Sequence, residues 1–207
     1  DDGMVIDDGV TSRLGENHYV MTTTTGNAAS VMSKLEDWLQ TEWPELKVYL
    51  TSITEQFATI SINGPYAPQL MKKLCPNHDF SKDNFPHMSF QNIEIDGVHC
   101  RVMRISFTGE MCYEINVPSS YAKALWQKCF NSGQEYNITP YGTEAMHVLR
   151  AEKGFIIVGQ ETDGSVTPID LDMNWIVSNK KYDFIGKRAL CRSDTIREDR
   201  KQLVGIF

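Results

Sequence analysis

The stretch Arg104–Pro118, RISFTGEMCYEINVP, decides the fold, because it places one acid in the middle of an apolar strand. Glu114 lies in the run Cys112–Pro118, whose β-branched and aromatic residues are typical of a strand. An ionised carboxylate is unremarkable on a wet sheet face, but on a dry face it is costly unless it is paired. Glu114 is therefore either a solvated strand acid or an acceptor for a ligand edge with two parallel N–H donors.

The segments around this strand predict an antiparallel sheet. Residues 57–63 alternate apolar and polar side chains, which indicates a half-buried strand, and Gly64-Pro65 ends it and begins a short helix. The Asp96-Gly97 pair predicts a hairpin between Ser89–Ile95 and Val98–Phe107. The strand that contains Glu114 then returns as a third antiparallel strand.

The rest of the chain mixes strands and helices without strict alternation, which predicts an α+β fold. Further strands are expected around residues 3–14, 19–23 and 48–53. A helix capped by Asn27 should follow the second of these and end before Pro44. Two later helices are expected, from Ser120 to a stop at Gly133 and over residues 141–153, and a long polar loop over 159–168.

Composition excludes several classes of function. A net charge of −7 without a Lys/Arg cluster argues against a nucleic-acid partner. No apolar run approaches the roughly 20 residues of a membrane span. The 5 cysteines form no C-x-x-C pair, which favours reduced thiols, a cytoplasmic location and no metal site. Fingerprints of nicotinamide, nucleotide and serine-hydrolase sites are missing. The first residue is not Met and the chain stops in an apolar run, so we expect a piece of a longer protein.

Six separated blocks of the sequence keep the order that they have in one enzyme family. These blocks are Gly3–Asp8, Ile62–Ala67, Phe107–Glu114, Leu149–Gly154, Thr167-Pro168 and Phe184–Arg188. In this order the chain resembles the folate-dependent aminomethyltransferase family of the glycine-cleavage T-protein. Tyr141–Gly154 and Val158–Gly164 look most like the T-protein-like part of heterotetrameric sarcosine oxidase α subunits.

The resemblance implies a folate site. It makes Glu114 the acid that pairs with the amino group and ring N–H of the pterin. Asp8 becomes the acid near the folate nitrogens that accept the one-carbon unit. Phe107 would lie against the pterin, and Tyr19 and Thr23 would occupy strand positions that line the folate pocket. By itself, the Asp-Asp-Gly sequence around Asp8 is also typical of a simple turn.

For function, the resemblance implies the tetrahydrofolate-binding domain of a sarcosine oxidase α subunit. This domain would capture the one-carbon unit of oxidised sarcosine as 5,10-methylenetetrahydrofolate. Flavin and NAD are then expected elsewhere in the complex, and the other subunits and the rest of its own chain are the expected partners. A non-catalytic folate-binding or assembly module is the alternative.

Two details complete the expectation. Met146 and His147 stand where the family usually has an Arg-Asp pair, which favours a one-carbon donor delivered differently from the lipoyl-bound donor of the T-protein. Residues 1–200 should form the folate-binding domain, and residues 201–207 the start of a C-terminal barrel.

Overall fold

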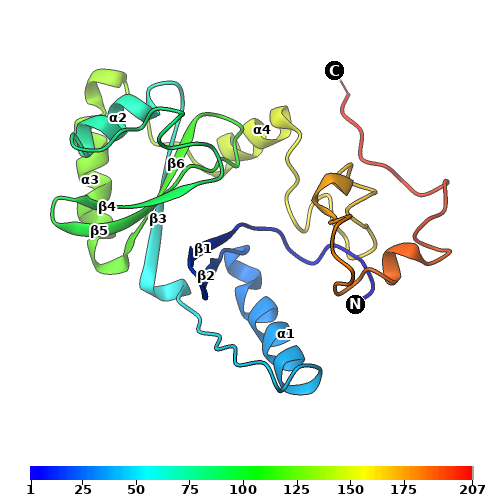
Figure 1. Cartoon of the computed structure of the whole chain (residues 1–207). Coiled ribbons are helices and arrows are strands. Elements are labelled where there is room, and N and C mark those ends of the chain that lie inside the picture. The colour runs from blue at the N-terminus through cyan, green and yellow to red at the C-terminus, as the bar shows by residue number, and fades with distance from the viewer. Residues whose placement is uncertain (207) are drawn as a thin grey trace. The chain divides into compact units, whose positions relative to one another are not determined.

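The computed structural model describes residues 1–206 and has the predicted α+β architecture (Figure 1). The chain divides into two compact units. We call Ser12–Val20 together with Met32–Phe155 the sheet unit. The terminal unit consists of Asp1–Thr11, Met21–Val31 and the residues from Ile156 onward. The sequence-based boundary after residue 200 stays a prediction.

The sheet unit is built on an antiparallel sheet of 4 strands in the order β3-β6-β5-β4. The strands are β3 (Phe57–Asn63), β4 (Phe90–Ile95), β5 (Val98–Met103) and β6 (Cys112–Pro118). The predicted hairpin is confirmed: Ile95 pairs with Val98, and Asp96 and Gly97 have φ of 50° and 77°. Two consecutive positive φ angles match the right-handed twist of the flanking strands, which explains the Asp-Gly pair.

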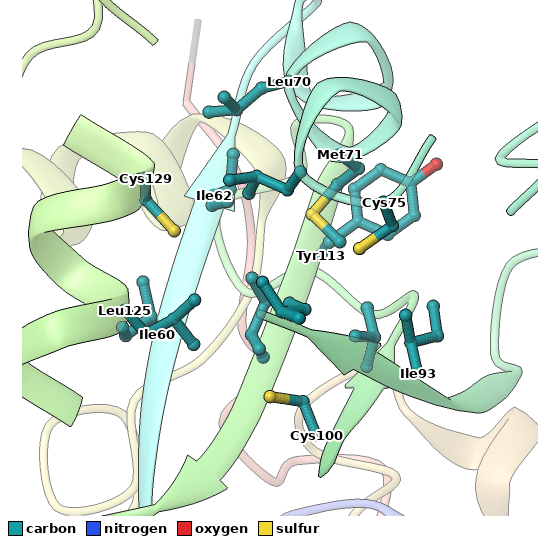
Figure 2. Packing of buried hydrophobic residues seen from close by; sticks show 14 of the residues in the cluster. Ile60, Ile62, Leu70, Met71, Cys75, Ile93, Cys100, Tyr113, Leu125 and Cys129 are labelled. Carbon is teal, nitrogen blue, oxygen red and sulfur yellow. The ribbon is translucent and has the colours of Figure 1, made fainter. Parts of the chain in front are cut away.

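Helices α2 (Ala67–Leu74) and α3 (Ala122–Ser132) cover one face of this sheet. Figure 2 shows apolar side chains of both helices gathered with those of the strands. Tyr113 of β6 is fully buried there, packs edge-on against Phe80 and donates its hydroxyl proton to the Phe80 carbonyl over 3.2 Å. This packed layer fixes the side of each strand that faces inward.

Three cysteines belong to the same core. Cys75, Cys100 and Cys129 are buried free thiols. Burial raises the pKa of Cys75 and Cys100 to about 11 and that of Cys129 to about 12. These thiols are therefore protonated near neutral pH and contribute as small apolar side chains.

The remaining elements largely follow the predicted pattern. Strands β1 (Thr11–Gly15) and β2 (His18–Met21) pair with each other, and α1 spans Ala28–Thr41. Helix α4 (Thr143–Lys153) ends at Gly154, whose φ of 82° is the left-handed conformation that glycine allows at a helix end. Short 3-10 helices lie at Thr25–Asn27, Thr54–Gln56, Ser119–Tyr121, Gln134–Tyr136, Asn174–Ile176 and Ala189–Cys191.

The strand predicted over residues 48–53 is wrong. This segment forms no strand, and Val48 and Tyr49 are 51% and 92% exposed. A short apolar run becomes a strand only where another strand pairs with it, and the run itself carries no information about a partner.

One buried ion pair ties the terminal unit together. Asp170 is 2% exposed and accepts hydrogen bonds from the Thr167 backbone N–H (2.7 Å) and hydroxyl (2.9 Å). Arg200 binds both oxygens of the same carboxylate over 2.8 and 2.6 Å, and also donates to the Ser165 carbonyl. Hydrogen bonding to Arg200 lowers the pKa of Asp170 to about 2. Arg200 thus joins the 165–170 loop to the C-terminal segment.

We predict that Asp170→Asn lowers the free energy of unfolding at pH 7 by about 2–3 kcal/mol. The folded-state pKa lies below the unfolded one, so the stabilisation is complete above about pH 4 and disappears as the pH falls toward 2. Urea unfolding at pH 7 and pH 3 should show a smaller difference between variant and wild type at pH 3. Asp194→Asn is the matched control, because its pair with Arg192 is exposed and should change stability by less than about 1 kcal/mol. An equal loss for both variants would contradict the assignment.

Candidate functional site

The alternation of β6 places Glu114 on the face of the sheet opposite to the core. Tyr113, Ile115 and Val117 are each 0% exposed in the packed layer. Successive side chains of a strand point to opposite faces, so Glu114 and its neighbours at 112 and 116 must lie on the other face. The three buried side chains of β6 therefore determine the face of the sheet on which Glu114 lies.

The face around Glu114 is polar on the β3 side, and on the β5 side it carries Met103 and Arg101. In the strand register Glu114 lies opposite Ser61 of β3 and opposite Met103 of β5, which is 1% exposed. We call the set on β3 and β6 the polar face; its members are Thr59, Ser61, Asn63, Cys112, Glu114 and Asn116. Glu114 is the one ionisable carboxylate of this set.

Glu114 is half-buried, and burial raises the pKa of its carboxyl group above the ordinary value. Its carboxylate has no hydrogen-bond or ion-pair partner among residues 1–206. A desolvated carboxylate without a partner destabilises the folded chain. A bound group with N–H donors would recover this cost.

A hydrogen-bond network adjoins Glu114 on the polar face. Its centre is Asn63, whose Oδ1 accepts from the Thr108 hydroxyl over 3.0 Å. The Asn63 Nδ2 donates to Ser61 Oγ over 3.0 Å and to the Tyr141 hydroxyl oxygen. Ser61 Oγ and Cys112 Sγ are 3.3 Å apart. This network presents neutral hydroxyl groups beside the carboxylate.

Tyr141 reaches this network from the loop before α4, which lies on the other side of the sheet from α2 and α3 (Figure 1). Burial, with smaller contributions from Cys112 and Glu114, raises the pKa of Tyr141 above its ordinary value. The phenol is therefore a neutral O–H group near pH 7. Tyr141 was not among the predicted site residues; the available signal was its position at the start of the block Tyr141–Gly154.

In the terminal unit, Asp7 holds the loop on which Asp8 lies. Asp7 Oδ1 accepts from the backbone N–H groups of Asp8 (2.8 Å) and Thr24 (3.3 Å). Its Oδ2 accepts from the side chain of Asn27 over 3.1 Å. A Cβ on Gly9 would lie 1.9 Å from the Thr22 carbonyl oxygen, so only glycine permits this close approach of the two segments.

Asp8 itself is an exposed residue whose carboxyl group is partly desolvated. This burial, and secondly the charge of Asp7, raises the pKa of Asp8 above its ordinary value. Asn27 was expected to cap α1, but its side-chain amide donates to Asp7 and to the Ile6 carbonyl. The role of Asn27 is thus to fix the acidic loop.

The other predicted site residues lie as follows. Thr23 is half-buried in the segment against which the Asp8 loop packs. Phe107 is half-buried but lies in the loop after β5, because that strand ends at Met103 and not at residue 107 as predicted. Tyr19 lies on β2 and is 55% exposed. Asp8 and Thr23 thus belong to the terminal unit, and Glu114, Phe107 and Tyr19 to the sheet unit.

Residues 1–206 offer no metal site and no membrane-spanning helix. No group of three or more His, Cys, Asp or Glu side chains in this range is arranged to hold a metal ion. None of the helices in the described part of the chain is long and apolar enough to cross a membrane.

Comparison with known proteins finds relatives over the whole chain. It is 57% identical over 207 residues to the sarcosine oxidase subunit alpha of Corynebacterium sp. (strain P-1), covering 100% of this chain and 21% of that protein. Identity to the subunit alpha of Rhizobium meliloti (strain 1021) is 42% over 208 residues, again with 100% and 21% coverage. An aminomethyltransferase of Caldanaerobacter subterraneus subsp. tengcongensis is 32% identical over 204 residues, covering 99% of the chain and 53% of that enzyme. The chain thus spans about one fifth of its sarcosine oxidase relatives.

A solved structure and a family profile agree with these matches. The crystal structure of the glycine cleavage system aminomethyltransferase T from Bartonella henselae superimposes with a TM-score of 0.77 at 22% identity, over 92% of this chain and 49% of that one. This likeness shows a shared fold. The profile of the GCVT N-terminal domain matches residues 1–181. The chain therefore belongs to the GCVT N-terminal domain family, as the six sequence blocks predicted.

Proposed function

We propose that this chain is the tetrahydrofolate-binding domain of a sarcosine oxidase α subunit. In this function it captures the one-carbon unit of oxidised sarcosine as 5,10-methylenetetrahydrofolate. The relatives with the names sarcosine oxidase subunit alpha and aminomethyltransferase support the proposal. Flavin and NAD would be held by other parts of the complex, and the partners would be the other subunits and the remainder of its own chain.

The observation that carries the proposal is the desolvated, unpartnered carboxylate of Glu114. A carboxylate has only acceptor sites, and two oxygens in one plane match two parallel N–H groups. The 2-amino group and the ring N–H of a pterin supply such an edge. The residues directly opposite Glu114, Ser61 and Met103, are neutral. Arg101 lies diagonally across on the same face, and its Nε has no hydrogen-bond partner among residues 1–206.

Asp8 is proposed as the catalytic acid–base group. Tetrahydrofolate supplies two amine nitrogens, which form two C–N bonds to the carbon of a formaldehyde equivalent while two N–H protons and the oxygen leave as water. A carboxylate within hydrogen-bond reach can accept a proton from the attacking amine or stabilise positive charge on it, an effect typically of about 10²–10⁴ in rate. Asp7 holds the Asp8 loop in place through three accepted hydrogen bonds. Phe107, Tyr19 and Thr23 are proposed to line the folate site.

We predict that Glu114→Gln weakens tetrahydrofolate binding by about 1–3 kcal/mol, or roughly 5- to 150-fold in Kd. The amide nitrogen of glutamine would face one of the ligand N–H donors, so one of the two hydrogen bonds is lost. Isothermal titration calorimetry under anaerobic conditions measures the change. Glu110→Gln is the matched control, because this acid is exposed in the loop just before β6. Equal affinity of the Glu114 variant and the wild type would exclude the assignment.

The same Glu114→Gln variant should be more stable than the wild type without ligand at neutral pH. The folded-state pKa of Glu114 lies above the unfolded one, so wild-type stability decreases as the pH rises from about 4 through the folded-state pKa. Glutamine does not titrate, so the advantage of the variant should grow over this range and then stay constant. Thermal unfolding between pH 4 and pH 8 measures it; a variant less stable at pH 8 would show that Glu114 has a stabilising partner.

We predict that Asp8→Asn leaves tetrahydrofolate affinity within about threefold of the wild type but lowers the yield of 5,10-methylenetetrahydrofolate by tenfold or more. The product is measured during sarcosine turnover by the intact enzyme, with free formaldehyde determined in parallel. Formaldehyde should replace the folate product in the variant. If the variant makes as much product as the wild type, Asp8 has no catalytic role. If tetrahydrofolate changes the products of neither protein, a non-catalytic folate-binding module is the better description.

A further inference from the structure

The Asn63 network forces the Tyr141 hydroxyl to act as a hydrogen-bond donor. Asn63 is oriented by Thr108, which donates to its Oδ1. Its Nδ2 then donates to both Ser61 Oγ and the Tyr141 oxygen. The hydroxyl oxygens of Ser61 and Tyr141 therefore each accept one hydrogen bond from the Asn63 amide nitrogen, which cannot accept one in return.

The hydroxyl protons of Ser61 and Tyr141 determine the direction of the remaining hydrogen bonds in the network. Ser61 Oγ also contacts the Cys112 thiol, and Ser61 is hydrogen-bonded to Tyr141. A thiol is a weak acceptor, so the Ser61 hydroxyl forms a stronger hydrogen bond when it donates to the Tyr141 oxygen than when it donates to Cys112 Sγ. With Asn63 and Ser61 both donating to it, the Tyr141 oxygen has its acceptor capacity filled. Its own proton must be donated outward.

The Tyr141 hydroxyl group lies near the unpartnered carboxylate of Glu114. Ser61, which contacts Tyr141, is the direct cross-strand neighbour of Glu114 on the polar face. Residues opposite each other on one face have Cβ atoms about 4.5–5.5 Å apart. Glu114 is close enough to raise the pKa of Tyr141, yet the two side chains form no hydrogen bond in the described part of the chain. One edge of a ligand can therefore meet both groups.

We propose that Tyr141 is a specificity residue that donates to a carbonyl oxygen beside the N–H edge held by Glu114; this rests on the proposed function. Glu114 and Tyr141 together would then recognise a heterocycle edge that presents two hydrogen-bond donors followed by one acceptor. A 2-amino-4-oxo ring presents an amino group, a ring N–H and a carbonyl oxygen in this order. A 2,4-diamino ring presents a second amino group in place of the carbonyl, which sets a donor against the Tyr141 donor, and its ring nitrogen carries no proton for Glu114.

Discrimination between these rings should be strong, because a mismatched buried donor loses its hydrogen bond without regaining water. The test compares tetrahydrofolate with its 4-amino counterpart, tetrahydroaminopterin, which differs at this substituent and at the adjacent ring N–H. Binding of both to the intact protein is measured by anaerobic calorimetry for wild type, Tyr141→Phe and Tyr121→Phe. Tyr121 is a matched control, because it lies outside the network on the 3-10 helix before α3 and is 49% exposed.

The wild type and Tyr121→Phe should bind the 4-oxo ligand at least about tenfold more tightly than the 4-amino ligand. In Tyr141→Phe the ratio should fall about fivefold or more below that of Tyr121→Phe, chiefly through weaker binding of the 4-oxo ligand, while the share of the ratio that Glu114 supplies through the ring N–H should remain. The inference about Tyr141 is overturned if the ratio of the two affinities is unchanged in Tyr141→Phe, or if the wild type binds both ligands equally. Tetrahydrofolate binding in that case still supports the proposed function. A wild type that binds neither ligand overturns both.

Discussion

The alternation of side chains along β6 is the constraint on which the sheet unit depends. Tyr113, Ile115 and Val117 are fully buried between the sheet and its two helices, and this burial fixes which way the strand faces. A shift of the register by one residue would place Glu114 in the apolar core and expose all three side chains, at a cost of several kcal/mol. The packed face of the sheet therefore determines the chemistry of the opposite face. Stability and site geometry are set by the same 7 residues.

Much of this arrangement is predictable from local sequence. The alternation of β3, the Asp96-Gly97 turn and the apolar period of α2 and α3 specify elements that the structure confirms within a few residues. These signals succeed because periodicity and turn geometry act over neighbouring residues. The segment 48–53 and the end of β5 were predicted wrongly because strand formation depends on a partner strand, which a short apolar run does not identify.

The candidate site was predictable only in part. Glu114 stands out because a charge inside an apolar strand is unusual, and Asp8 because two acids precede a glycine. The polar groups that lie around these acids were not recognised. Asn63 and Tyr141 are 78 positions apart, and Asp7 and Asn27 are 20 apart. Contacts at such separations arise from tertiary packing, so neither member of a pair carries a local signal. Asn27 shows the result most clearly: its residue type suits a helix cap, but its amide fixes the acidic loop.

The buried cysteines have a consequence under the proposed function, in which the domain would handle a formaldehyde equivalent. Thiolates add rapidly to electrophilic carbon, and a reactive thiol near the site would intercept the substrate and become alkylated. Cys112 lies next to Glu114 on the same face of β6, but burial raises its pKa to about 12, so its sulfur is a protonated thiol at pH 7. The desolvation that raises the pKa of Glu114 thus also keeps the neighbouring Cys112 in its unreactive thiol form.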